Sequence, residues 1–337
     1  MCMILMLTTY LINKDIKTND ENVEVSAIYD NSASSIVMDK ITKRVLYKNN
    51  INERMLPAST TKILTCITAL ELYNLDDVVI VTKEMLMVDG SSIYLEVGDV
   101  ITILDLLYGL MLCSGNDAAL ALAYHYSGND KDFIYEMNKL AKKIGMKNST
   151  FENPHGLDEY TKNYTTVYDM ALLMSYALNN EVFCKITKTI KYNPVIVSNK
   201  RLYFYNKHRL IRNMDNVTGG KTGYTKKAHR TLVTSFKKEE FEIVVVTFNC
   251  SDDWNVHRSL AEYVFNQYQV TKIVSKFELE LKNLSNDFYI KSNKLFIPIS
   301  KDEQIHYEID KTQEELIVIY YLEKSKIGYI TFGSLDE

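Results

Sequence analysis

The hydrophobic residues of this chain change their spacing twice, and these changes limit the fold more than any other feature of the sequence. Residues 35–38 and 44–47 are β-rich runs that flank a turn-like segment, so they predict a hairpin. Between residues 57 and 178 the apolar side chains follow helical spacing, and from Gly219 onward β-branched residues dominate again. Separate β and α regions predict an α+β fold, with an antiparallel sheet packed with helices plus a helical subdomain.

The helical part has clear starts and breaks. A helix is predicted from Pro57, because proline suits a first helical turn. Further helices are predicted over residues 102–112, 117–126, 130–144 and 165–178. The first two of these are separated by Cys113–Asn116, where glycine and small polar residues interrupt the helical pattern.

The β pattern that follows predicts a second hairpin, formed by residues 230–236 and 242–249 around the charged turn Lys237–Glu240. Residues 259–268 have the spacing of a helix that would close the domain against its sheet. We therefore expect one large domain over residues 25–270.

The character of the chain changes again beyond Thr271. Apolar and charged residues alternate over Phe277–Lys282, and β-rich runs recur at 316–322 and 327–332. Alternation of this kind predicts half-buried strands. Residues 271–337 are therefore expected to form a small all-β domain.

Residues 1–24 are expected to be a leader or signal-like segment followed by a polar linker. Met3–Ile12 is mostly apolar and of signal-peptide length, but basic residues do not precede it, and it is too short to span a bilayer. A shortened signal peptide, a signal anchor and a frayed apolar tail all fit this pattern.

Composition excludes several classes of function. The net charge is −4, so no overall basic field attracts nucleic acid, and none is expected as a partner. The five cysteines include no CxxC pair and the six histidines no HExxH motif, so we expect no metal site, no disulfide framework and no cofactor. Any substrate must be recognised by local groups.

The first of three motifs that can carry chemistry is Ser59-Thr60-Thr61-Lys62. Near a helix start, residues three apart share a face, so Lys62 can reach the Ser59 hydroxyl. A desolvated lysine near another cation has a lowered pKa, which lets it act as the base that a serine nucleophile needs. Alone, this pattern is more typical of a helix-capping serine followed by a solvated lysine.

The second motif, Ser114-Gly115-Asn116, falls at the predicted helix break, on a loop held between two helices. A hydroxyl there can relay a proton, and a carboxamide can hold a substrate amide. Alone, these residues are typical of a turn that caps and joins two helices.

The third motif, Gly219–Tyr224, directly precedes the second hairpin and is itself a candidate strand. Its glycines leave space for an extended substrate beside the backbone. Lys221 and Thr222 offer a cation and a hydroxyl suited to a carboxylate. The alternative is a plain glycine-rich turn; a phosphate-binding P-loop is excluded, because Asp215 stands where its first glycine belongs.

The three motifs follow one another at a helix start, a helix break and a strand, and this set resembles the active site of penicillin-binding proteins and serine β-lactamases. The flanking residues narrow the likeness to the low-molecular-mass D-alanyl-D-alanine carboxypeptidases. Similar segments are Pro57–Lys62, Leu112–Ala119, Phe151–Asp158, Tyr168–Ala171 and Gly220–Thr225. The likeness covers roughly Val25 to Tyr268 and implies a β-lactamase/transpeptidase-like fold.

The resemblance implies a serine-type hydrolase of peptidoglycan biosynthesis and cell shape, a carboxypeptidase that acts on stem peptides ending in D-alanyl-D-alanine. β-Lactam antibiotics would be its inhibitors, and its place would be extracytoplasmic, with peripheral membrane association as one alternative. The implied roles are nucleophile for Ser59, base for Lys62, proton relay for Ser114, amide binding for Asn116, carboxylate binding for Lys221 and Thr222 beside Gly223, and oxyanion binding by the backbone N–H groups of Ser59 and Tyr224.

Two departures from the family pattern affect this expectation. Some members place an arginine after the second hairpin, whereas this chain has Cys250–Asn255 there, so carboxylate binding would rely more on Lys221 and Thr222. Asn163–Thr166 stands where a histidine-containing variant is frequent.

Two other functions compete with the carboxypeptidase. A serine β-lactamase is the nearest enzyme, although no Glu-x-x-Leu-Asn segment supplies a deacylating glutamate. From another class, a β-lactam-sensing or wall-binding module would acylate without turnover.

Overall fold

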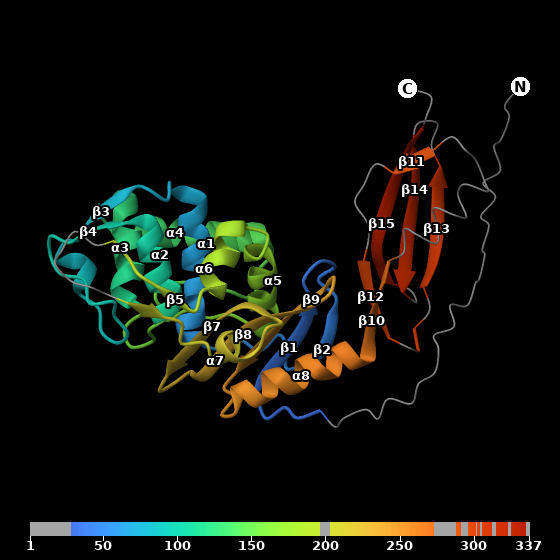
Figure 1. Cartoon of the computed structure of the whole chain (residues 1–337), viewed down its shortest axis with the longest axis horizontal. Coiled ribbons are helices and arrows are strands. Elements are labelled where there is room, and N and C mark those ends of the chain that lie inside the picture. The colour runs from blue at the N-terminus through green and yellow to red at the C-terminus, as the bar shows by residue number, and fades with distance from the viewer. Residues whose placement is uncertain are drawn as a thin grey trace, which may run out of the picture. The chain divides into compact units, whose positions relative to one another are not determined.

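The computed structural model describes residues 28–195, 203–272, 288–290, 296–300, 302–303, 305–311, 315–322 and 325–334. It divides into two compact units, one of Ala27–Glu262 and another that takes in the chain from Tyr263 onward. The predicted leader and the predicted alternation at 277–282 lie outside the described residues. Figure 1 shows the order of the elements along the chain.

The first unit is built on a five-stranded antiparallel sheet with the strand order β2-β1-β9-β8-β7. Both predicted hairpins are present, and the strand β1 pairs with β9 to join them. The glycine-rich motif forms β7, at an edge of the sheet. The five strands are β1 (Ser34–Asp39), β2 (Val45–Asn49), β7 (Val217–Thr225), β8 (His229–Lys238) and β9 (Phe241–Phe248).

The sheet is covered on both faces. Strand β9 is almost wholly buried, which explains why its sequence is a continuous β-branched run and does not alternate. Helix α5 (Val167–Ala177) packs against β1 and β9, while α8 (Asp253–Gln267) brings His257 within 3.0 Å of Thr247 on β9. The closing helix therefore exists, but it begins six residues before the predicted start at Ser259, because the polar turn before it already has helical backbone.

The helical layer surrounds α1, whose first eight residues are all buried. The predicted helices are present, although the 102–112 run contains a short α-helix followed by a π turn over Gly109–Cys113. Two short helices, α6 and α7, were not predicted, because runs of eight and five residues are too short to show a clear helical period. The helices are α1 (Lys62–Leu72), α2 (Ile103–Tyr108), α3 (Asn116–Ser127), α4 (Asp130–Ile144), α6 (Glu181–Lys188) and α7 (Arg209–Asn213), with 3-10 turns at Ala58–Thr61 and Glu84–Leu86.

Short β pairs complete the helical side: β3 (Val78–Ile80) with β4 (Val100–Thr102), and β5 (Lys191–Tyr192) with β6 (Phe204–Tyr205). The observed architecture, an antiparallel sheet packed with helices beside a helical layer, confirms the predicted α+β class. In the described part of the chain, no helix combines the length and the apolar character needed to cross a membrane.

The described residues of the second unit form two small antiparallel sheets. The predicted runs at 316–322 and 327–332 form neighbouring strands in the larger sheet, whose order is β11-β15-β14-β13. The strands are β10 (Tyr268–Lys272), β11 (Phe288–Ile290), β12 (Phe296–Ser300), β13 (Ile305–Lys311), β14 (Glu315–Leu322) and β15 (Ser325–Ser334), and β10 pairs with β12.

Replacing Phe236 on β8 tests how far the first unit depends on its sheet. The side chain is fully buried, so Phe236→Ala should lower the free energy of unfolding by about 3–5 kcal/mol through lost burial and a residual cavity. Lys238→Ala, at an exposed position of the same strand, should change it by less than about 0.5 kcal/mol. Denaturant unfolding followed by circular dichroism measures both; equal effects would contradict the assigned burial.

Candidate active site

The candidate nucleophile follows a strained turn. Ala58 has φ +50°, a left-handed conformation that costs a residue with a side chain on the order of 1–3 kcal/mol. Ser59 comes next, and Thr231 on β8 holds the turn by donating a hydrogen bond to the Pro57 carbonyl oxygen at 2.9 Å. Gly156, with φ +89°, packs on the same turn, since a Cβ there would lie 1.9 Å from the Ala58 oxygen. Glycine is therefore required at position 156.

Lys62 places its amine against the Ser59 hydroxyl. The side chain is fully buried, and Nζ lies 2.9 Å from Ser59 Oγ. Nζ also donates hydrogen bonds to Asn116 Oδ1 at 2.7 Å and to the His155 carbonyl oxygen at 2.6 Å. These two oxygens can only accept, so they occupy two N–H donors. The remaining position on the nitrogen faces Ser59, and in a neutral amine this is the lone pair that accepts a proton.

The surroundings of Lys62 favour its neutral form. Burial lowers the pKa of the amine well below its usual value, and the positive charges of Lys221 and Lys207 lower it further. The neighbouring imidazole does not compete as a base. Burial lowers the pKa of His155 to about 3, and its Nδ1 already accepts a hydrogen bond from the Leu157 N–H.

Two buried asparagines position the carbonyl that holds Lys62. Asn153 Oδ1 accepts hydrogen bonds from the His155 and Gly156 N–H groups at 3.2 and 2.6 Å, which shapes this turn. Asn163 Nδ2 donates to Thr61 Oγ1 at 3.1 Å and to the Asn153 carbonyl oxygen at 3.0 Å. The turn is thereby joined to the residue that precedes α1, and the carbonyl is fixed relative to the amine.

Ser114 and Lys221 form a second pair of hydroxyl and amine. Ser114 has φ +63°, which ends the π turn and separates it from α3. Lys221 Nζ donates hydrogen bonds to Ser114 Oγ at 3.0 Å and to the Thr222 carbonyl oxygen at 2.8 Å. Burial lowers the pKa of Lys221 to about 7, and the charge of Lys207 acts in the same direction.

Asn116 is occupied within the protein at both ends of its carboxamide. Its Oδ1 accepts from Lys62, and its Nδ2 donates to the Asp89 carbonyl oxygen at 2.6 Å. The side chain is buried, and it does not line the cleft formed by the described residues. The structure thus places Asn116 where it holds the amine.

Gly223 brings the edge strand β7 against the nucleophile. A Cβ at this position would lie 2.9 Å from Ser59 N and 2.3 Å from Thr231 Oγ1, so the strand can approach only because the side chain is missing. The next backbone N–H along the strand belongs to Tyr224, whose side chain is exposed. The Ser59 N–H therefore lies against the edge strand, beside the residue that precedes Tyr224.

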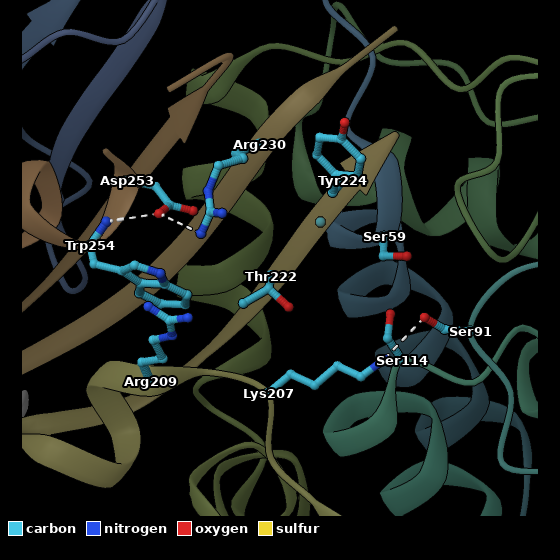
Figure 2. Close-up of a pocket in the computed structure, with 11 residues that line it drawn as sticks. Ser59, Ser91, Ser114, Lys207, Arg209, Thr222, Tyr224, Arg230, Asp253 and Trp254 are labelled. Atoms are coloured by element: carbon cyan, nitrogen blue, oxygen red, sulfur yellow. Dashed lines mark hydrogen bonds and ion pairs between the residues drawn. The ribbon is translucent and has the colours of Figure 1, made fainter. Parts of the chain in front are cut away.

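A pocket of about 360 Å³ opens beside these groups (Figure 2). Of the predicted residues, Ser59, Ser114, Thr222, Gly223 and Tyr224 line it, whereas Lys62, Asn116 and Lys221 are buried behind its surface. Its other lining residues were not predicted as site residues; they are Ser91, Lys207, Arg209, Arg230, Asp253 and Trp254. The described residues hold no group of three or more histidine, cysteine, aspartate or glutamate side chains that could bind a metal ion.

These groups meet the requirements of acyl transfer through a serine ester. An amine can take the proton of the Ser59 hydroxyl, a second hydroxyl accepts a hydrogen bond from a second amine, and the Ser59 N–H lies against an edge strand. The fold presents them between an antiparallel sheet and a helical layer. Fold and site together define a serine acyl-transfer enzyme of the transpeptidase-like class.

Comparison with known families identifies the particular branch of this class. Residues 19–252 match the model of the D-alanyl-D-alanine carboxypeptidase family, peptidase S11. This match covers more than half of the chain, so the chain belongs to that family. The predicted family and the predicted enzyme class, a serine-type D-alanyl-D-alanine carboxypeptidase, are confirmed.

Two curated relatives and one solved structure show the extent of the likeness. The chain is 33% identical to D-alanyl-D-alanine carboxypeptidase DacF of Bacillus subtilis, over 79% of this chain and 69% of that one. It is 31% identical to DacC of Escherichia coli, over 69% of this chain and 60% of that one. Penicillin binding protein 5 of Haemophilus influenzae has the same fold, with a TM-score of 0.75 and 24% identity over 93% of this chain and 99% of that one.

A side chain at Gly223 should disable the site without unfolding the protein. Gly223→Ala forces β7 away from the Ser59 N–H, so we expect kcat/KM for D-alanine release from a D-alanyl-D-alanine peptide to fall by roughly 100-fold or more.

Gly219→Ala is the matched control for that change. It introduces the same methyl group on the same strand, but the clash is with Thr187, 2.4 Å away on α6. It should lower stability and leave most of the activity. Equal loss of activity in both variants would mean that the approach of Gly223 to Ser59 has no special role.

Proposed function

We propose that this chain removes the terminal D-alanine from peptidoglycan stem peptides through an acyl-enzyme on Ser59. The observation that carries the proposal is the contact between Lys62 Nζ and Ser59 Oγ at 2.9 Å, with the other donors of the amine held by two acceptors. A serine is a weak nucleophile unless a base takes its proton, and this geometry supplies that base.

The first half-reaction forms the ester. Ser59 Oγ attacks the carbonyl carbon between the two terminal D-alanines, and its proton passes to Lys62. The bond to the leaving nitrogen then breaks as that nitrogen takes a proton from Ser114, which regains one from the amines beside it. Support for this relay comes from the hydrogen bond between Lys221 and Ser114. Water then hydrolyses the ester and releases the shortened peptide.

Charge on the carbonyl oxygen would be met by the backbone N–H groups of Ser59 and Tyr224. Donors of this kind act mainly in the transition state and contribute about 3 kcal/mol each. The close approach of Gly223 to Ser59 N supports this role for the edge strand.

Of the remaining predicted residues, one would contact the substrate directly, and two lie behind the surface of the pocket. Thr222 lines the pocket and offers its hydroxyl to the terminal carboxylate, while Lys221 lies behind it and adds positive charge. Asn116 holds the Lys62 amine through its Oδ1, and the predicted role of orienting the substrate amide would require its Nδ2 to leave the Asp89 carbonyl oxygen.

We further propose that the protein acts outside the cytoplasmic membrane, where mature peptidoglycan lies. Residues 25–270 would be the catalytic domain and residues 271–337 a separate small β domain. The compact unit that takes in the chain from Tyr263 onward supports such a division. Peripheral association with the membrane is part of the same proposal.

Brief exposure to benzylpenicillin, followed by intact mass and peptide mass spectrometry, tests the proposed function. β-Lactams would acylate the same serine, so the mass of one penicillin should appear on the peptide containing Ser59. Ser59→Ala should carry none, and Lys62→Met should react roughly 100- to 10,000-fold more slowly. An adduct on another residue would overturn the proposal.

Turnover separates the competing functions. A carboxypeptidase should release D-alanine continuously from a pentapeptide and keep its penicillin adduct. A β-lactamase would shed the adduct quickly, and a sensing module would release no sustained D-alanine.

The pH dependence of acylation should move when Lys207 loses its charge. The reaction needs neutral Lys62 and protonated Lys221, so the rate rises as pH passes the pKa of Lys62 and falls as it passes that of Lys221, about 7. Positive Lys207 lowers the pKa of both lysines, so Lys207→Gln raises both. The whole profile should shift to higher pH. Lys238→Gln, at an exposed position, is the control, and a shift to lower pH would contradict the assignment.

A further inference from the structure

A buried histidine rests on the edge strand directly before Lys221. His208 is 1% exposed, and α7, which follows it in the chain, lies beside β7 (Figure 1). A Cβ at Gly220 would lie 2.5 Å from His208 Nε2 and 2.8 Å from its Cδ2. The edge of the imidazole therefore lies where a side chain is missing, and β7 cannot move towards the ring at this point.

Hydrogen bonds hold the imidazole against β8. Its Nε2 lies 3.0 Å from Thr234 Oγ1 and 3.3 Å from the Val233 carbonyl oxygen. Burial lowers the pKa of His208 to about 3, so the ring is neutral and carries one N–H. That N–H is on Nε2, because the carbonyl oxygen can only accept. Thr234 pairs with Gly220 and Val233 with Lys221, so this one ring contacts both strands at the same level of the sheet.

A second buried histidine shares the Thr234 hydroxyl. Thr234 Oγ1 lies 2.8 Å from His257 Nδ1, and His257 Nε2 lies 3.0 Å from Thr247 Oγ1 on β9. Burial lowers the pKa of His257 as well, so this ring is also neutral. The two histidines thus have the same environment and one partner in common. They differ in their other contacts, because His208 rests on β7 and the second partner of His257 is on β9.

The backbone that carries His208 is fixed too. Its N–H donates a hydrogen bond to Asn206 Oδ1 at 2.9 Å, and Asn206 Nδ2 donates to the carbonyl oxygens of Thr187 and Thr189 at the C-terminal end of α6. In the part of the chain that the structure describes, His208 Nδ1 has no hydrogen-bond partner. The contacts of Nε2 therefore orient the ring.

The position of Gly220 decides where the Lys221 amine lies. Successive residues of a strand point to opposite faces, so the Lys221 side chain leaves β7 on the face away from the imidazole. On that face its Nζ donates a hydrogen bond to Ser114 Oγ at 3.0 Å. Because hydrogen bonds depend steeply on distance and angle, a shift of the strand at Gly220 would weaken this contact.

We propose that His208 is a positioning residue for the proton relay, which holds the Lys221 amine against Ser114 by fixing β7 at Gly220. The proposal rests on the function proposed above. When the amide bond breaks in that reaction, the leaving nitrogen keeps the electron pair of the bond and takes the proton of the Ser114 hydroxyl, which regains one from Lys221. His208 touches none of the reacting atoms and exchanges no proton in this step.

Leaving groups that differ in their need for a proton test this role. An amine does not leave as an anion, whereas a thiolate does, because the pKa of a thiol is only about 8.5. The experiment measures kcat/KM for a D-alanyl-D-alanine peptide and for the thioester in which sulfur replaces the leaving nitrogen. His208→Leu should lower the ratio of the amide value to the thioester value by roughly 10-fold or more. A general fault in folding or in substrate binding would lower both values together and leave the ratio unchanged.

His257→Leu is the matched control. It removes the other imidazole bound to Thr234 and so should also lower stability, but it should leave the ratio unchanged. His208→Gln should restore much of the ratio, because its amide nitrogen can donate in place of Nε2. Thr234→Val keeps the shape of the side chain and removes the hydroxyl that orients the ring, so the ratio should fall in the same direction.

The outcomes separate this proposal from the proposed function. An unchanged ratio in His208→Leu, or in Thr234→Val should the first variant not fold, would overturn the proposal. An equal fall of the ratio in His257→Leu would overturn it as well. A wild-type protein that cleaves neither the amide nor the thioester would overturn the proposed function instead.

Discussion

A buried amine with a fixed set of neighbours is the constraint on which the site depends. Lys62 Nζ has two oxygens that can only accept, and the third direction is left to the Ser59 hydroxyl. Burial removes the water that would stabilise a charged lysine, and Lys221 adds repulsion. The position of the Lys62 amine and the preference for its neutral form therefore have the same cause, which is the burial of this side chain.

That enclosure requires elements that are far apart in the sequence. The Asn116 side chain comes from the start of α3, the His155 carbonyl from a loop fixed by Asn153 and Asn163, and Gly223 from the edge of the sheet. The loop and the edge strand approach so closely that only glycine fits at positions 156 and 223. The contacts that pack these elements around the first turn of α1 are thus the same contacts that position the Lys62 amine and the Ser59 hydroxyl.

The sequence predicted the groups that depend on local spacing. Ser59 and Lys62 share a helix face, and continuous β-branched runs identified β8 and β9. The sequence could not predict which backbone groups contribute to the site, nor which distant residues the fold brings into it. Every residue has a backbone carbonyl, so the residue type at position 155 could not indicate that its carbonyl binds Lys62. The segment Phe151–Asp158 was nevertheless identified as similar to the family. Arg209 and Arg230 are separated in the chain and line one pocket only because β8 pairs with β7 and α7 packs on β7, so single arginines in these segments gave no signal.

The left-handed backbone conformation of Ala58, directly before Ser59, affects how this protein can evolve or be engineered. Ala58 holds an unfavourable backbone angle, and Lys62 is a basic group sealed in the interior. Both features lower the stability of the native state, yet both adjoin Ser59, the nucleophile proposed above. Random substitutions selected only for heat resistance would tend to relax this turn or replace the amine with an apolar chain, so screens of that kind need activity as a second criterion.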